Sequence, residues 1–188
     1  MAPEQVEADI AVLSGAVDEV ARTGNFEAFE KPEVEAAADR AHRFDLRNCG
    51  WTAAEVRGVE YAFEGIPQTI RAGVVSFEFS VPSSATEVHE LVVIRKNDAV
   101  TESFEQLLQQ PEEQVRQKTT SVAGVEPTRP GDDGNSVARL QPGEYLVACF
   151  LPVGATPALF EQIEAGQAQP PEGPPHVARG MRAQFTVR

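Results

Sequence analysis

After Trp51 the sequence consists of short runs of β-branched and aromatic residues, each ended by glycine or proline. One such run covers residues 74–81 and another covers residues 87–95. Runs of this length and composition are typical of strands joined by turns. Because no strand–helix–strand pattern repeats along the chain, we predict a mainly β fold, a sandwich rather than a parallel sheet.

Helical stretches interrupt the strands at two places. Residues 103–118 open with a capping box, Ser103 and Gln106, and contain Pro111, where we expect a break or kink. A second, short helix is expected over residues 157–165, inside a long proline-rich excursion. The other elements expected in this part are a loop over residues 127–135 and strands over residues 136–140, 144–150 and 182–188.

The N-terminal part of the chain has a helical pattern instead. Apolar residues recur at steps of three and four, as in an amphipathic helix that ends near Thr23-Gly24-Asn25. A second helix is expected over residues 32–44, with a proline in its first turn. We therefore predict two parts, an N-terminal helical hairpin over residues 1–50 and a β-sandwich over residues 51–188.

The charge of the chain limits its partners. Sixteen basic and 29 acidic side chains give a formal net charge of −13, which repels phosphate backbones and anionic lipids. We expect no nucleic-acid partner, whereas a basic protein partner is compatible with this charge. No run of residues has the length and apolarity of a membrane span, and residues 1–18 lack the pattern of a signal peptide.

One set of side chains matches the needs of a copper site. A mononuclear electron-transfer site uses one soft thiolate and two imidazoles in a plane, with a weak axial thioether. The candidate residues lie where expected strands meet loops, and they are His89, Cys149, His176 and Met181. Gly180 allows the segment from His176 to Met181 to fold back, so that both side chains face one ion.

Each of these residues also has a structural interpretation. Cys149, in Val-Ala-Cys-Phe, is compatible with a small core residue, and a lone histidine on a strand is often a buried polar group with a hydrogen-bond partner. His42, on the second expected helix, is interpreted as a surface residue. Cys49 and Cys149 allow one internal disulfide at most, but we predict that they are not bonded to each other, because a disulfide would consume the proposed thiolate.

Other chemistries have weaker support in the sequence. Glu87 and Glu90 flank His89, but they point to opposite faces of the expected strand and do not form an acid/base pair. No phosphate-binding loop, nucleophile elbow or Cys-x-x-Cys motif is present. An enzyme is therefore the least favoured class.

The order of several segments resembles a known family. Ahead of the four candidate ligands and between them stand Glu60-Tyr-Ala-Phe63, Ala72-Gly73 and Leu140-Gln-Pro-Gly-Glu-Tyr145. From Glu55 to Arg188 the chain resembles the plastocyanin and azurin superfamily, the cupredoxins. This resemblance implies a Greek-key sandwich with one copper ion per chain, held by His89, Cys149 and His176 with Met181 as axial ligand.

The segment between Cys149 and His176 departs from the small cupredoxins, in which only a few residues separate these ligands. We expect this excursion to hold His176 less rigidly, to cover the site or to bind a partner. The helical prefix and the Asn48-Cys49-Gly50 junction are similar to a secreted bacterial branch of the family, in which the junction cysteine has a partner in the preceding helix. No such cysteine precedes Cys49 here.

Two functions follow from these observations. The first is a copper-binding cupredoxin that transfers electrons to a basic redox protein or holds copper. The alternative is a metal-free module of the same fold that binds a protein or another ligand. We expect an extracellular or cell-envelope location, with the export leader absent from this sequence, and a cytoplasmic location stays open.

Overall fold

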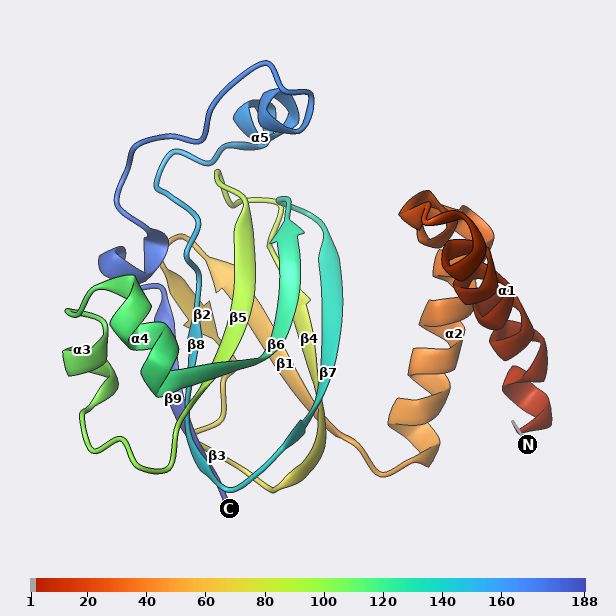
Figure 1. The fold of residues 1–188 in the computed structure, drawn as a ribbon, viewed down its shortest axis with the longest axis horizontal. Coiled ribbons are helices and arrows are strands. Elements are labelled where there is room, and N and C mark those ends of the chain that lie inside the picture. Colours follow the sequence, from red (N-terminus) through yellow and green to blue (C-terminus); the bar gives the residue numbers. More distant parts are fainter. Residues whose placement is uncertain (1–2) are drawn as a thin grey trace. The chain divides into compact units, whose positions relative to one another are not determined.

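The computed structural model describes residues 3–188. Contacts divide the chain after Trp51 into a helical unit and a β unit that begins at Thr52. Each unit is described by itself (Figure 1). Within the described residues, no helix has the length and apolarity needed to cross a membrane.

The helical unit is a hairpin of two helices with short 3-10 turns. Its elements are η1 (Glu4–Val6), α1 (Glu7–Thr23), η2 (Phe26–Glu30) and α2 (Pro32–Asn48). Gly24 ends α1 in the left-handed conformation at φ 71°, and Pro32 occupies the first turn of α2. The side chains buried between the helices are mostly small, so the hairpin has a thin core.

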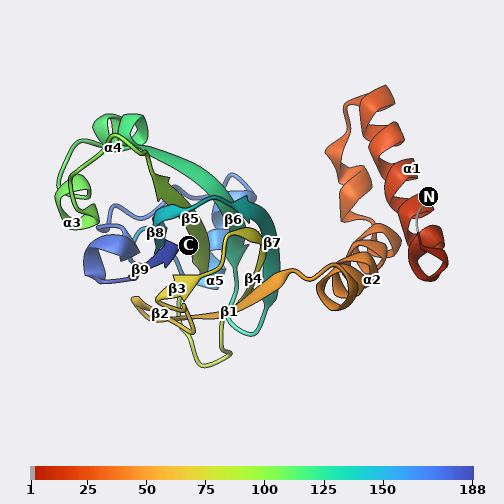
Figure 2. The same ribbon diagram turned by 90° about the horizontal axis from the view of Figure 1, so that it is seen from below.

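The β unit is a sandwich of two mixed sheets that lie face to face (Figure 2). One sheet has the order β2-β1-β4-β7, and its strands are β1 (Thr52–Val59), β2 (Ala62–Glu64), β4 (Gly73–Ser80) and β7 (Asp133–Leu140). The other has the order β3-β9-β8-β5-β6, with strands β3 (Thr69–Ile70), β5 (His89–Lys96), β6 (Thr119–Thr128), β8 (Gly143–Ala148) and β9 (Arg182–Val187). The predicted sandwich with a helical N-terminal segment is confirmed.

The main core lies between the two sheets. Alternate residues of β4 point inward, so that Val75, Phe77 and Phe79 are almost fully buried. They belong to one apolar cluster with residues of the facing sheet, such as Leu91 and Tyr145. The strands that carry this core also set the positions of the residues at their ends.

Strand β6 was not expected from the sequence, and β7 begins earlier than predicted. Residues 119–128 contain Gly124 and Pro127, both unfavourable in strands, and they follow directly after a helix. The structure places β6 at the edge of its sheet, paired with β5, where proline is tolerated. Pairing with β4 likewise extends β7 back to Asp133, through residues that locally favour a turn.

The expected helix over residues 103–118 is broken at Pro111 into α3 (Phe104–Leu107) and α4 (Glu112–Lys118). Ser103 and Gln106 form the predicted capping box. Phe104 and Leu107 pack in a second apolar cluster with Val177, which lies close to the C-terminal end of the chain. This cluster anchors the segment that follows His176.

The long excursion between β8 and β9 contains α5 (Pro157–Glu164) and η3 (His176–Arg179). Its two ends meet in an isolated β-bridge between Pro152 and Pro175. The Val153 N–H donates to the Pro174 carbonyl at 3.0 Å next to this bridge. The excursion is therefore closed at its base.

Candidate metal centre

Three of the four predicted ligands converge at one end of the sandwich. His89 is the first residue of β5, Cys149 directly follows β8, and His176 opens η3. All three side chains are fully buried. One ligand atom from each lies within 4.8 Å of those of the other two.

The same ring nitrogen of both histidines faces the cluster. His89 Nδ1 lies 3.2 Å from His176 Nδ1, and the latter lies 3.3 Å from Cys149 Sγ. One sulfur and two imidazole nitrogens form the soft donor set typical of copper sites, whereas hard cations such as Mg²⁺ and Ca²⁺ prefer oxygen. The donors present therefore fit a copper ion.

Backbone hydrogen bonds hold the two loop ligands in place. The Val177 N–H donates to the Cys149 carbonyl at 2.8 Å, and the His176 N–H donates to the Leu151 carbonyl at 2.8 Å. Gly180, with φ 111°, ends η3 in the left-handed region that favours glycine. The chain therefore turns at Gly180, as predicted from the sequence.

Met181 is joined to both loop ligands through its backbone. Its N–H donates to the His176 carbonyl at 3.0 Å, and its carbonyl accepts from the Cys149 N–H at 3.3 Å. The side chain is fully buried, and its methyl group would lie 3.3 Å from a Cβ atom placed on Gly58 of β1. The axial role of Met181 stays a prediction.

Burial governs the protonation of the metal-free site. Desolvation raises the pKa of the Cys149 thiol to about 12, although the Glu90 N–H donates to Sγ at 3.5 Å and favours the thiolate. Desolvation, together with the proximity of His176, lowers the pKa of His89 to about 4. At neutral pH the site therefore holds a thiol and a neutral His89, and a metal ion must displace the thiol proton.

Glu87 is a site residue that the sequence analysis did not assign. Its Oε2 lies 2.8 Å from His176 Nε2, and the carboxylate also accepts from the Tyr61 hydroxyl at 3.0 Å and the Gly154 N–H at 2.9 Å. Burial acts to raise the pKa of Glu87, but these hydrogen bonds outweigh it and lower the pKa. Glu87 lies two residues before His89, the first residue of β5, and no local sequence pattern indicates its contact with His176, 89 positions away in the chain.

The excursion is bonded to the site rather than loose. Besides the bond from Gly154 to Glu87, the Val88 N–H donates to the Ala155 carbonyl at 2.8 Å. The expectation that a long excursion holds His176 less rigidly therefore does not describe this structure. The closed base fixes the residues just before His176.

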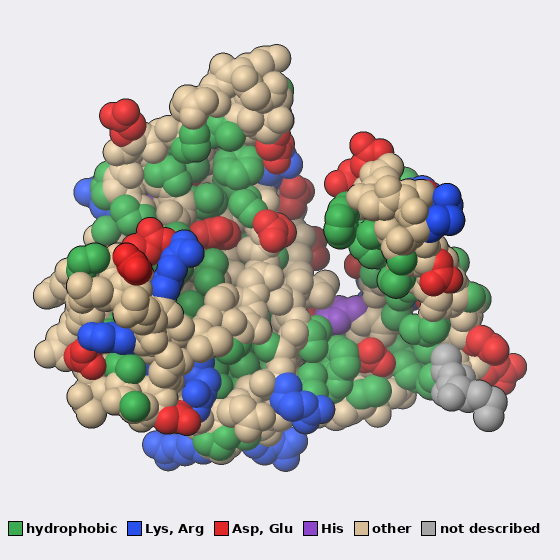
Figure 3. Space-filling view, in the orientation of Figure 1, with side chains coloured by type: hydrophobic (Ala, Val, Ile, Leu, Met, Phe, Trp, Pro, Cys, Tyr) green, Lys and Arg blue, Asp and Glu red, His purple; other side chains and the backbone are tan. Residues whose placement is uncertain are grey.

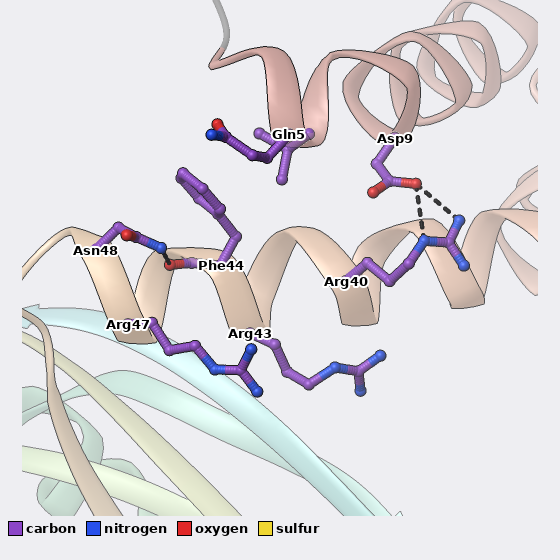
Figure 4. A pocket seen from close by; sticks show the side chains of 8 residues that line it. Gln5, Asp9, Arg40, Arg43, Phe44, Arg47 and Asn48 are labelled. Atoms are coloured by element: carbon purple, nitrogen blue, oxygen red, sulfur yellow. Dashed lines mark hydrogen bonds and ion pairs between the residues drawn. The ribbon is translucent and has the colours of Figure 1, made fainter.

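The remaining candidates lie elsewhere. Cys49 is an exposed thiol in the helical unit, and both it and Cys149 are free cysteines. His42, half-buried on α2, packs near the Trp51 ring at 6.2 Å between centroids. A cavity of about 230 Å³ in the helical unit is lined by Gln5, Asp9 and basic residues of α2. Arg40 donates a hydrogen bond to Asp9, whereas Arg43 and Arg47 point away from α1 (Figure 4).

A larger groove of about 720 Å³ adjoins the metal centre. Phe150 and Val177, the neighbours of Cys149 and His176 in the chain, line it together with Pro175. Its other walls come from β5, β6 and the α3–α4 segment. Phe150 is 42% exposed, so an apolar surface lies one residue away from Cys149.

A β-sandwich with a buried cysteine and two histidines at one end is the architecture expected from the resemblance. No family model matches the chain, and no curated protein matches it. Solved structures of cupredoxins do match. The chain is similar to auracyanin A, a "blue" copper protein from Chloroflexus aurantiacus, at 16% identity over 74% of this chain and 100% of that chain, with a TM-score of 0.41.

Two further matches are similarly distant. Rusticyanin from Thiobacillus ferrooxidans is 15% identical over 73% of this chain and 77% of its own, with a TM-score of 0.43. The azurin of Methylomonas sp. strain J is 10% identical over 73% of this chain and 98% of its own, with a TM-score of 0.41. Because these identities and TM-scores are low, we base the function on the geometry of the site.

Proposed function

We propose that the β unit binds one copper ion per chain through His89, Cys149 and His176, with Met181 as a weak axial ligand. The observation that supports this proposal is the convergence of one sulfur and two Nδ1 atoms, all fully buried, within 4.8 Å. Packing alone requires neither this choice of residue types nor their common orientation. Copper held there would carry one electron by alternating between two oxidation states.

The chain's own residues would prepare the site. Cys149 supplies the sulfur once its proton is displaced, and the Glu90 N–H then stabilises the negative charge on it. His89 supplies a neutral ring, because its lowered pKa of about 4 keeps it unprotonated at neutral pH. The full burial of the three side chains excludes water from the donors, which favours electron transfer over hydrolytic chemistry.

Copper titration of the purified protein tests the proposal. We expect uptake of one copper ion per chain and strong visible absorption from thiolate-to-copper charge transfer. Met181→Leu should leave a coloured site with a shifted reduction potential, since an axial thioether bonds weakly. Absence of both binding and colour with Cys149 reduced would refute the copper function, and loss of binding in Met181→Leu would refute the axial role alone.

A basic redox protein is the partner we propose for this site. On the face shown in Figure 3, several Lys and Arg side chains gather at the lower end of the sandwich. The excursion with α5 lies at the opposite, upper end (Figure 1). The net charge of −13 also favours a cationic partner, and we place this exchange in the extracellular or cell-envelope space that the resemblance implies.

The groove beside Phe150 supports a second candidate function. Its volume of about 720 Å³ and its mixed apolar and polar lining are compatible with a bound small molecule. A metal-free binding module would use this groove and leave Cys149 as a buried thiol. Failure to bind copper, combined with ligand-induced stabilisation that Phe150→Ala abolishes, would favour this alternative.

A further inference from the structure

Glu87 connects three parts of the chain that meet at the metal centre. It receives hydrogen bonds from His176, from Tyr61 in the β1–β2 turn and from Gly154 in the excursion. The Glu60 carboxylate accepts from the Glu87 N–H at 3.4 Å and also binds Thr86. Glu87 is therefore held at both its backbone and its side chain.

Tyr61 has an unusual backbone conformation that fits this arrangement. Its φ of 57° lies in the left-handed region, which an aromatic residue rarely adopts. The Tyr61 and His176 rings pack in a T-shaped contact with 5.3 Å between centroids, while the Tyr61 hydroxyl donates to Glu87. A sparsely populated conformation is thus retained where it orients both Glu87 and His176.

The contact between Glu87 and His176 determines which ring nitrogen carries the proton. An ionised carboxylate can only accept hydrogen bonds, so the neutral His176 ring must carry its proton on Nε2. Nδ1 then has a free lone pair, and Nδ1 is the atom that faces Cys149 Sγ at 3.3 Å. One contact therefore fixes both the tautomer and the orientation of the ring.

The two histidines differ in this respect. Nε2 of His89 is buried and has no hydrogen-bond partner, whereas Nε2 of His176 has a carboxylate partner. A carboxylate behind an imidazole increases the basicity of the opposite nitrogen. The two nitrogen donors of the site are therefore unequal.

We propose that Glu87 is a positioning residue that fixes His176 as its Nε2–H tautomer and strengthens His176 Nδ1 as a ligand. The effect on the metal rests on the copper function proposed above, but the effect on the tautomer does not. The competing explanation is that Glu87 only anchors the excursion through Gly154. The two explanations differ in what they predict for a neutral side chain that still accepts a hydrogen bond.

Three variants of the full chain separate these explanations. Glu87→Gln keeps an acceptor and removes the charge, and Glu87→Ala removes both. Glu113→Gln on α4 is the control, because it makes the same charge change at an exposed position on an element that carries no candidate ligand. Circular dichroism and thermal unfolding of the metal-free variants check that each one folds.

The first readout needs no metal. Nitrogen NMR of the imidazole rings in the metal-free protein should show His176 as the Nε2–H tautomer in the wild type, Glu87→Gln and Glu113→Gln. In Glu87→Ala we expect a mixture of tautomers. A wild-type Nδ1–H tautomer, or the same pure Nε2–H tautomer in a folded Glu87→Ala protein, would overturn the positioning role.

The second readout uses copper. We expect Glu87→Ala to weaken copper binding 10–100-fold. Glu87→Gln should retain the visible band and most of the affinity but raise the reduction potential, since a neutral partner stabilises copper(II) less. Glu113→Gln should change neither quantity, and equal potentials in the wild type and Glu87→Gln would overturn ligand strengthening. A wild-type protein that binds no copper would refute the copper function together with ligand strengthening, and the first readout would still decide the tautomer.

Discussion

The helical unit and the β unit bury very different side chains. The buried apolar residues of the helical unit are Val6, Ala16, Ala28, Val34 and Ala37, whereas the sandwich fully buries Phe77, Tyr145 and Leu91. Among residues 3–188, five of the seven exposed large hydrophobic side chains belong to the helical unit, Ile10, Val12, Val17, Phe26 and Phe29. A large core can offset the cost of burying a thiol and two imidazoles, and the thin one cannot.

The largest expected difference between the units concerns their two cysteines. Cys149→Ser should abolish the visible absorption of the copper-loaded protein, because hydroxyl oxygen does not replace a soft thiolate. Cys49→Ser, the same change at an exposed site in the helical unit, should leave the spectrum unaltered. Loss of colour in the Cys49 variant would show that the wrong thiol has been assigned.

The same phenylalanine truncation in each unit compares their cores. Phe77→Ala should lower the free energy of unfolding of the β unit by about 3–5 kcal/mol, because Phe77 is fully buried. Phe26→Ala should cost less than about 0.5 kcal/mol, because Phe26 is 69% exposed. Urea denaturation measures both changes. Equal losses of stability in the two variants would contradict the conclusion that the helical unit has the smaller core.

Acid should destabilise the metal-free sandwich through His89. Its pKa is 6.5 when unfolded and about 4 when folded, so the unfolded chain binds more protons between these values. The contribution of His89 to the free energy of unfolding is fully present above pH 6.5. It falls by roughly 3 kcal/mol as the pH drops to 4. Urea midpoints across this range should therefore fall less in His89→Gln than in the wild type, and parallel curves would contradict the assignment.

Cys149 should destabilise the metal-free protein at high pH. Its pKa rises from 9.0 to about 12 on folding, so its contribution is present below pH 9 and is lost as the pH rises towards 12. The two groups together predict a stability maximum of the metal-free protein between pH 6.5 and 9. Cys149→Ser should remove part of the alkaline decline.

The smallest effects compare a serine that caps a helix in the β unit with a serine inside a helix of the helical unit. Ser103→Ala should cost about 1 kcal/mol, because the Ser103 side chain caps α3. Ser14→Ala, inside the exposed part of α1, should be neutral or stabilising by up to about 0.5 kcal/mol, since alanine is the better helix former. A urea midpoint that is unchanged or raised in Ser103→Ala would contradict the capping role.

Local sequence patterns predicted the elements whose residues agree with their final environment. The capping box at Ser103, the break at Pro111 and the turn at Gly180 are set by residues close together in the chain. Strand β6 was missed because its pairing with β5 overrides the local preferences of Gly124 and Pro127. Local propensity is a weak guide where a neighbouring strand supplies the hydrogen bonds.

The candidate ligands were accessible from the sequence because few residue types bind copper and the chain has few of them. The role of Glu87 was not, because the contact with His176 joins residues 89 positions apart. The closed base of the excursion escaped prediction for the same reason, since Gly154 and Ala155 bond to the segment before β5. Contacts between distant segments depend on the completed fold.

The bridge between Pro152 and Pro175 also has a consequence for protein engineering. The chain leaves and re-enters the sandwich at this bridge, so residues 154–173 form a loop with paired ends. A change in the length of this loop should have little effect on the positions of the candidate ligands. The entropic cost of closing such a loop increases only slowly with the number of residues in it. A peptide tag inserted beyond α5 should therefore leave this bridge, and with it the position of His176, unchanged.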